Sequence, residues 1–158
     1  MPKVISGERV GKQGRLAVGC SAAVFDADRQ SILLVRRADN GRWDVPGGYM
    51  EAGEGVTEAC AREVLEETGL QVQVKRLISV YTNPHLLLEY SDGNHLQLVV
   101  LHFETESIGG HLKSNEETSE LKYFSQSETA ELEMTPLGRL RVNDAFAAQE
   151  AAIIRDTF

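Results

Sequence analysis

The chain has 158 residues, of which 42% are hydrophobic and 25% are charged, as is typical of one globular domain with a sizeable core. The net charge of −8 argues against binding to a nucleic acid polymer, because such a surface needs clustered lysines and arginines. The longest apolar run, Leu96 to Phe103, is too short to span a bilayer, and the polar N-terminus is not a signal peptide.

Apolar periodicity and turn-forming residues predict an alternation of strands and helices. In chain order we expect strands over 16–26, 31–37 and 43–48, a helix over 56–68, strands over 70–82, 85–90, 95–106 and 120–125, and a closing helix over 137–155. The strands at 16–26 and 31–37 are close enough in sequence to form a hairpin. Gly69 is placed to end the central helix. This order predicts an α/β fold with a mixed sheet between helices.

The cysteines and histidines carry no metal-binding pattern. Cys20 and Cys60 do not form a CxxC motif, and we expect two buried free thiols in a cytoplasmic protein rather than a disulfide. None of the four histidines has zinc-like spacing to a cysteine.

The central helix carries an unusual acidic stripe. At about 100° per residue, Glu63, Glu66 and Glu67 lie on one side of the helix, near the end where its dipole disfavours negative charge. One interpretation is a solvated acidic face that Arg62 neutralises. The other is a Mg²⁺ site, because carboxylate oxygens and a carbonyl from the preceding glycine loop at 46–55 are the hard ligands that this ion prefers.

The same stretch resembles the Nudix box, G-x5-E-x7-R-E-U-x-E-E-x-G-U, in which U is a bulky aliphatic residue. Residues 48–70 fill every defined position of that motif. The resemblance implies a single Nudix domain over residues 1–158, folded as an α/β/α sandwich. It also implies Mg²⁺- or Mn²⁺-dependent hydrolysis of a nucleoside diphosphate linked to another moiety, such as ADP-ribose or a nucleoside triphosphate. Many members are homodimers.

The resemblance also implies roles for individual residues. The metal ligands are expected to be the Gly48 carbonyl and the carboxylates of Glu63, Glu66 and Glu67, with Glu63 as an alternative catalytic base. Arg62 resembles the arginine that orients a catalytic glutamate. Support of the loop and helix is expected from Gly47 and Glu54, while Glu51 holds a position that is often acidic.

In many family members the catalytic base lies on a loop well after the box. The segment "SNEETSELKYF" matches that position, and Glu117 is the first candidate, followed by Glu116 and Glu120. The alternative is a polar hairpin loop without a catalytic role.

Arg37 and Trp43 flank the glycine loop and could contact substrate, although a strand-end arginine and a core aromatic explain them equally well. Pro84 resembles a marker of ADP-ribose hydrolases at an approximate spacing. Two other functions compete with hydrolysis: a Nudix-fold sensor that binds a nucleotide without cleaving it, and isopentenyl diphosphate isomerisation. The complete glutamate set favours hydrolysis.

Overall fold

The computed structural model describes residues 1–158. Its elements are β1 (Lys3–Ser6), the 3-10 helix η1 (Val10–Gln13), β2 (Arg15–Val24), β3 (Ser31–Arg37), β4 (Trp43–Asp44), β5 (Gly47–Tyr49), α1 (Val56–Thr68), β6 (Leu70–Thr82), β7 (Leu86–Glu89), β8 (His95–Gly110), β9 (Thr118–Ser125), α2 (Gln126–Thr129), α3 (Pro136–Ala147) and β10 (Ile153–Arg155). None of the helices has the length and apolar character needed to cross a membrane.

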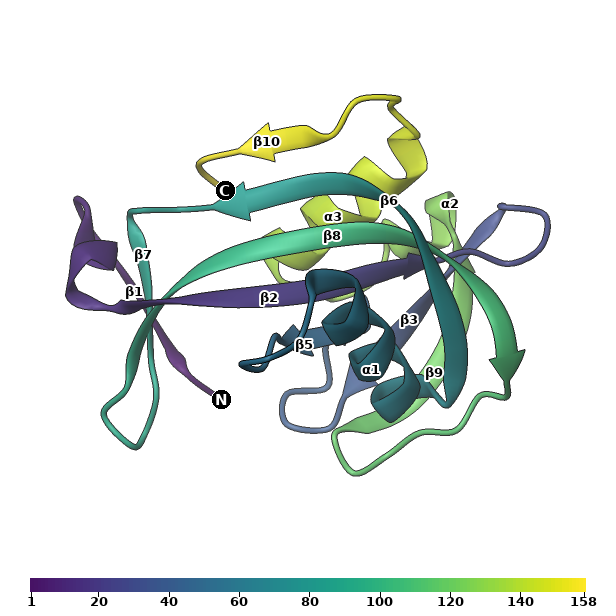
Figure 1. Ribbon diagram of the computed structural model, residues 1–158, viewed down its shortest axis with the longest axis horizontal. Helices are drawn as coiled ribbons and strands as arrows, with labels where there is room; N and C mark the ends of the chain where they lie inside the picture. The colour runs from purple at the N-terminus through teal and green to yellow at the C-terminus, as the bar shows by residue number, and fades with distance from the viewer.

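The strands form two sheets between helices. The larger sheet has seven strands, ordered β1-β7-β8-β2-β5, with β6 beside β8 and β10 beside β6. It is mixed, because β2 runs parallel to β8 and β10 runs parallel to β6. The smaller sheet is β4-β3-β9. Figure 1 shows α1 in front of the strands and α3 behind them, which confirms the predicted α/β/α sandwich.

Each helix layer closes its own apolar core. Between α1 and the sheet, helix residues Ala59, Cys60 and Val64 pack with strand residues such as Cys20 and Leu33. Behind the sheet, Val142 and Ala145 of α3 complete a second cluster with residues of the smaller sheet. Cys20 and Cys60 are buried free thiols, as predicted.

Locally encoded elements have their predicted bounds. β3, α1 and β6 begin and end where the sequence pattern places them. Gly69 ends α1 in the left-handed conformation (φ 76°), and its amide donates to the Leu65 carbonyl, which is the predicted helix stop.

Two predictions are wrong: the hairpin of the strands at 16–26 and 31–37, and the length of the closing helix. β2 and β3 belong to different sheets, and their only backbone pairing is the bridge between Phe25 and Ile32, because β2 pairs instead with the distant strand β8. The closing helix ends at Ala147, where Ala148 turns into the left-handed region (φ 49°). The residues beyond form β10, whose β-branched isoleucines suit a strand.

Candidate active site

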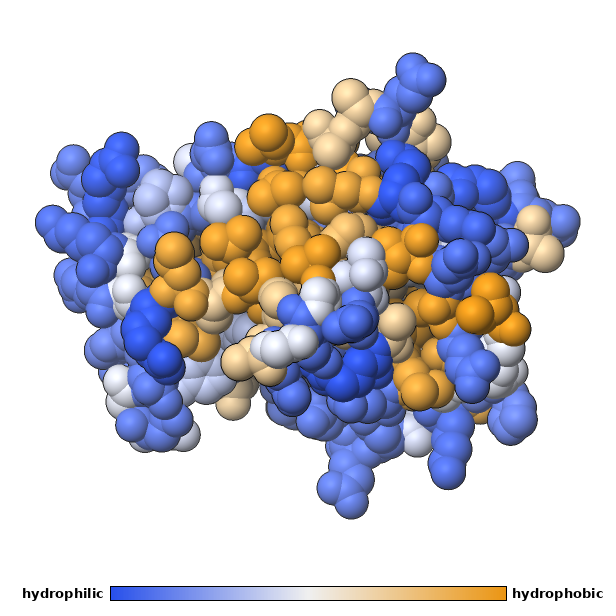
Figure 2. Space-filling view, viewed as in Figure 1, coloured by the Kyte–Doolittle hydropathy of each residue, from blue (hydrophilic) through white to orange (hydrophobic).

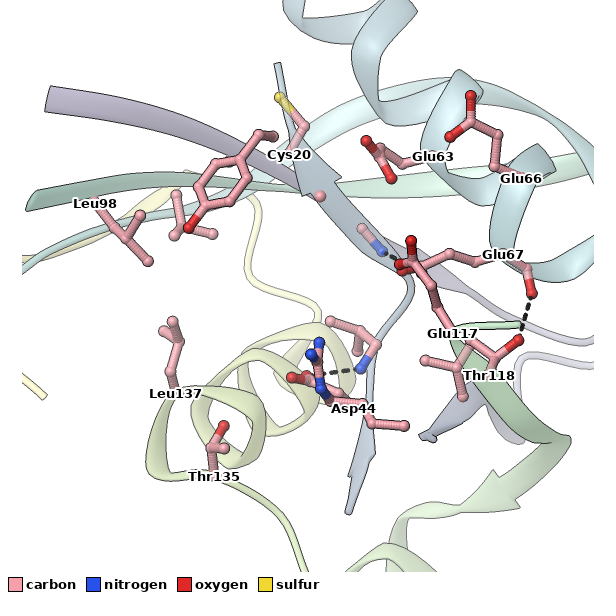
Figure 3. Close-up of a pocket in the computed structure, with 18 of the residues that line it drawn as sticks. Cys20, Asp44, Glu63, Glu66, Glu67, Leu98, Glu117, Thr118, Thr135 and Leu137 are labelled. Carbon is pink, nitrogen blue, oxygen red and sulfur yellow. Dashed lines mark hydrogen bonds between the residues drawn. The ribbon is translucent and has the colours of Figure 1, made fainter. Parts of the chain in front are cut away.

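A cavity of about 610 Å³ lies between three segments. These are the glycine loop, the side of α1 that carries its glutamates, and the segment before β9. Most of the site residues predicted from the sequence line it: Arg37, Gly47, Gly48, Arg62, Glu63, Glu66, Glu67 and Glu117. Figure 3 shows the carboxylates of Glu63, Glu66, Glu67 and Glu117 gathered on one side of this cavity. The acidic stripe therefore faces a cavity and is not simply a solvated surface.

Glu67 is the most buried of these carboxylates. Its side chain accepts a hydrogen bond of 2.9 Å from the Gly47 amide, and the residue is only 8% exposed. Burial first, and then the nearby charges of Glu63, Glu117 and Asp44, raise the pKa of Glu67 to about 8, against the opposing effect of the Gly47 hydrogen bond. An ionised Glu67 therefore needs a compensating positive charge.

Glu63 lies directly against the backbone of β5. A Cβ atom built on Gly48 would overlap the Glu63 carboxylate, so a larger residue here would displace that carboxylate from its present position. Burial raises the pKa of Glu63, and the hydrogen bond from Arg62 opposes that shift. Glu66 is the most open of the three, with 55% of its side chain exposed.

Arg62 holds the acidic cluster together. Its Nε and Nη2 donate to the two oxygens of Glu54 at 2.5 and 3.0 Å, while Nη1 donates to Glu63 at 2.7 Å and to Glu66 at 3.3 Å. Glu54 also accepts from the Glu51 amide at 2.9 Å. These bonds, first the one from Arg62, lower the pKa of Glu54 to about 2. Glu54 does not line the cavity. Its hydrogen bonds connect the glycine loop with α1 through Arg62.

The donor set fits a divalent cation, although it is not a closed protein cage. No three His, Cys, Asp or Glu side chains are close enough together to enclose an ion. Mg²⁺ commonly takes only one or two protein carboxylates and completes its shell with water and substrate phosphates. Two crowded carboxylates, Glu63 and Glu67, with raised pKa values provide a charge that such an ion neutralises.

Among the three candidate bases, only Glu117 lines the cavity. Its side chain extends toward Glu67 in Figure 3. Its carbonyl accepts from the Ala38 amide at 2.8 Å, which fixes the loop on its outer side. Glu116 does not line the cavity, and Glu120 lies on β9 beside Arg36 at 3.5 Å.

The two predicted substrate contacts have different positions. Arg37 lines the cavity and forms a two-nitrogen fork to Asp39 at 3.0 and 2.8 Å. Trp43 is 9% exposed and packs edge-to-face on Phe124 at a centroid distance of 4.8 Å. Trp43 is therefore a core residue and does not line the cavity.

Sequence reasoning missed several lining residues, because distant segments contribute them. Arg141 of α3 donates to Asp44 at 2.7 Å, and Tyr49 pairs with the Tyr90 hydroxyl. Asn115 lies beside Glu117 and was overlooked. The one local feature that could have indicated Asn115 is its position, as a polar residue two places before the candidate base Glu117.

An α/β/α sandwich whose helix glutamates face a cavity beside a glycine loop defines the architecture of a Nudix pyrophosphohydrolase. A family model described as "NUDIX domain" matches residues 15–146. The chain belongs to the NUDIX family.

Three curated relatives illustrate the similarity. The chain is 40% identical to an ADP-ribose pyrophosphatase of Methanocaldococcus jannaschii over 59% of this chain, a stretch that spans 53% of that enzyme. It is 36% identical to a putative 8-oxo-dGTP diphosphatase of Bacillus subtilis, over 74% of this chain and 72% of the relative. It is 34% identical to a MutT-like protein of Streptomyces ambofaciens, over 78% and 73%.

Solved structures agree with the fold. A crystal structure of an ADP-ribose pyrophosphatase from Streptococcus suis superposes with a TM-score of 0.65 at 25% identity, covering 89% of this chain and 98% of that one. A NUDIX hydrolase from Nitrosomonas europaea reaches a TM-score of 0.72 at 21% identity, covering 90% and 79%.

Proposed function

We propose that the protein hydrolyses the pyrophosphate linkage of a nucleoside diphosphate joined to another moiety, in a reaction that needs Mg²⁺ or Mn²⁺. One observation carries the proposal: the three glutamates of the Nudix box and Glu117 line the same cavity. ADP-ribose and nucleoside triphosphates such as 8-oxo-dGTP are the first substrate candidates, since relatives are named for such substrates.

Each acidic residue has a proposed task. The Gly48 carbonyl and the carboxylates of Glu63, Glu66 and Glu67 would hold the cation, which when bound neutralises phosphate charge and makes water more acidic. Arg62 fixes the orientation of Glu63 and Glu66 through the hydrogen bonds described above. Glu117 accepts the proton that the attacking water loses, as a general base.

The opposite end of the cavity suits the uncharged part of a substrate. Leu98 and Leu137 lie across from the glutamates in Figure 3, and the tyrosine pair Tyr49 and Tyr90 also lines the cavity. Apolar and aromatic side chains favour a planar base, as in most small-molecule sites. We therefore place the phosphates at the glutamate end and the base toward Leu98.

The proposal is tested with ADP-ribose, nucleotide sugars, dinucleoside polyphosphates, dGTP and 8-oxo-dGTP in the presence of Mg²⁺, with release of AMP or phosphate as the readout. Glu117→Gln should lower kcat by roughly 10²–10⁴-fold, whereas its neighbour variant Glu116→Gln should stay close to wild type. Tight binding of a nucleotide without turnover would support the sensor alternative instead. Equal activity of the two variants would remove Glu117 from its role.

The cellular location is also part of this proposal. Cys20 and Cys60 are both free and buried, which supports a reducing compartment such as the cytoplasm.

A further inference from the structure

The segment that carries Glu117 is joined to the last turn of α1 by side chains. Backbone carbonyls in the last turn of a helix have no amide partner within the helix. Asn115 Nδ2 donates to the Glu66 carbonyl at 3.0 Å, and Thr118 Oγ1 donates to the Glu67 carbonyl at 3.1 Å. The loop thus caps the backbone of Glu66 and Glu67, two of the three glutamates that are proposed to hold the cation.

Asn115 also organises its own loop. Its Oδ1 accepts from the amides of Glu117 at 2.9 Å and of Thr118 at 3.0 Å. One side chain therefore connects the backbone of Glu117 with the backbone of Glu66. Thr118 is 2% exposed, so the base of the loop has little room to move.

We propose that Asn115 is a positioning residue that fixes the placement of the Glu117 carboxylate relative to the glutamates of α1. This inference rests on the proposed role of Glu117 as the base. Loss of the connection leaves Glu117 chemically intact but free to shift. A misplacement of about 1 Å in a catalytic group can cost roughly 100-fold in rate.

The test is a double-mutant cycle in the full chain. Asn115→Ala should lower kcat by about 10–100-fold and change KM less than about threefold. In a Glu117→Gln background, Asn115→Ala should lower kcat little further, because the carboxylate that Asn115 positions is already absent.

The matched control is Asn94→Ala. It removes an asparagine whose Nδ2 donates to Asp92 in the β7–β8 turn, and it should keep wild-type kcat.

Wild-type kcat in Asn115→Ala would overturn the inference, and so would a loss that multiplies fully with that of Glu117→Gln. The proposed function fails separately, if the wild-type protein hydrolyses none of the nucleotides.

Helix α1 covers only part of one face of the large sheet (Figure 1), and Figure 2 shows a hydrophobic area over the remainder. The most exposed apolar residues on this face are Leu16 and Ile154, at 70% and 74%.

Discussion

Replacement of Glu67 by glutamine should stabilise the metal-free protein while it abolishes hydrolysis. Glu67 is 8% exposed, and its pKa is raised from 4.5 to about 8. Because the folded state resists ionisation, the stability that Glu67 contributes is present below pH 4.5 and is lost as the pH rises toward 8. At about 1.4 kcal/mol per pKa unit, the cost at pH 7 is on the order of 3 kcal/mol.

Glutamine keeps the oxygen that accepts from the Gly47 amide and removes the charge. Urea unfolding in EDTA at pH 5 and pH 8 measures the effect. Glu67→Gln should be nearly as stable as wild type at pH 5, and more stable at pH 8 by a few kcal/mol. Added Mg²⁺ should stabilise wild type much more than the variant, since a ligand stabilises in proportion to its binding to the folded state. If Glu67→Gln is less stable than wild type at pH 8 without metal, the reasoning from desolvation is wrong.

Three further predictions follow from other contacts. Burial lowers the pKa of His102 to about 3. Wild type should therefore lose roughly 2 kcal/mol of unfolding free energy between pH 6.5 and pH 5 from this group, and urea titrations of His102→Asn should lack that loss. Gly48→Ala introduces a Cβ against the Glu63 carboxylate and should lower kcat at least about tenfold, whereas Gly55→Ala, which meets only ordinary contacts, should match wild type in the same assay. The lysine of Arg62→Lys cannot donate from two nitrogens to Glu54 as Arg62 does. This variant should have a lower kcat and a melting temperature lower by a few degrees. Unchanged turnover and an unchanged melting temperature in calorimetry would contradict the role of Arg62 in holding the acidic cluster.

How far the sequence predicts this site depends on how local each signal is. The bounds of α1, its stop at Gly69 and the common side of its glutamates follow from helical periodicity and glycine conformation. The pairing of β2 with β8 joins residues about 80 positions apart, and no local pattern encodes it. Trp43 was open to two interpretations because its sequence neighbours do not reveal Phe124, on which it packs.

The same limit applies to the base. The family resemblance gives Glu117 as the first candidate, followed by Glu116 and Glu120, but all three are glutamates in one polar segment and the sequence does not show which of them faces the site. The structure separates them by direction: Glu117 lines the cavity, while Glu120 pairs with Arg36 on the smaller sheet. That direction depends on Asn115 and on the Ala38 amide, which are tertiary contacts.

The two buried titrating groups, Glu67 and His102, change the stability of the metal-free protein with pH in opposite directions. Glu67 removes stability as the pH rises from 4.5 toward 8, and His102 removes stability as the pH falls from 6.5 toward 3. Between pH 4.5 and 6.5 the two slopes are of opposite sign and similar size, so they largely cancel. The metal-free protein should therefore be most stable over this mildly acidic range. A cation beside Glu67 removes only the alkaline loss, because the pKa of His102 is set by burial and by the charges of Arg141 and Asp144, and not by the glutamates. Metal binding should accordingly extend the stable range upward in pH and leave its acid limit unchanged.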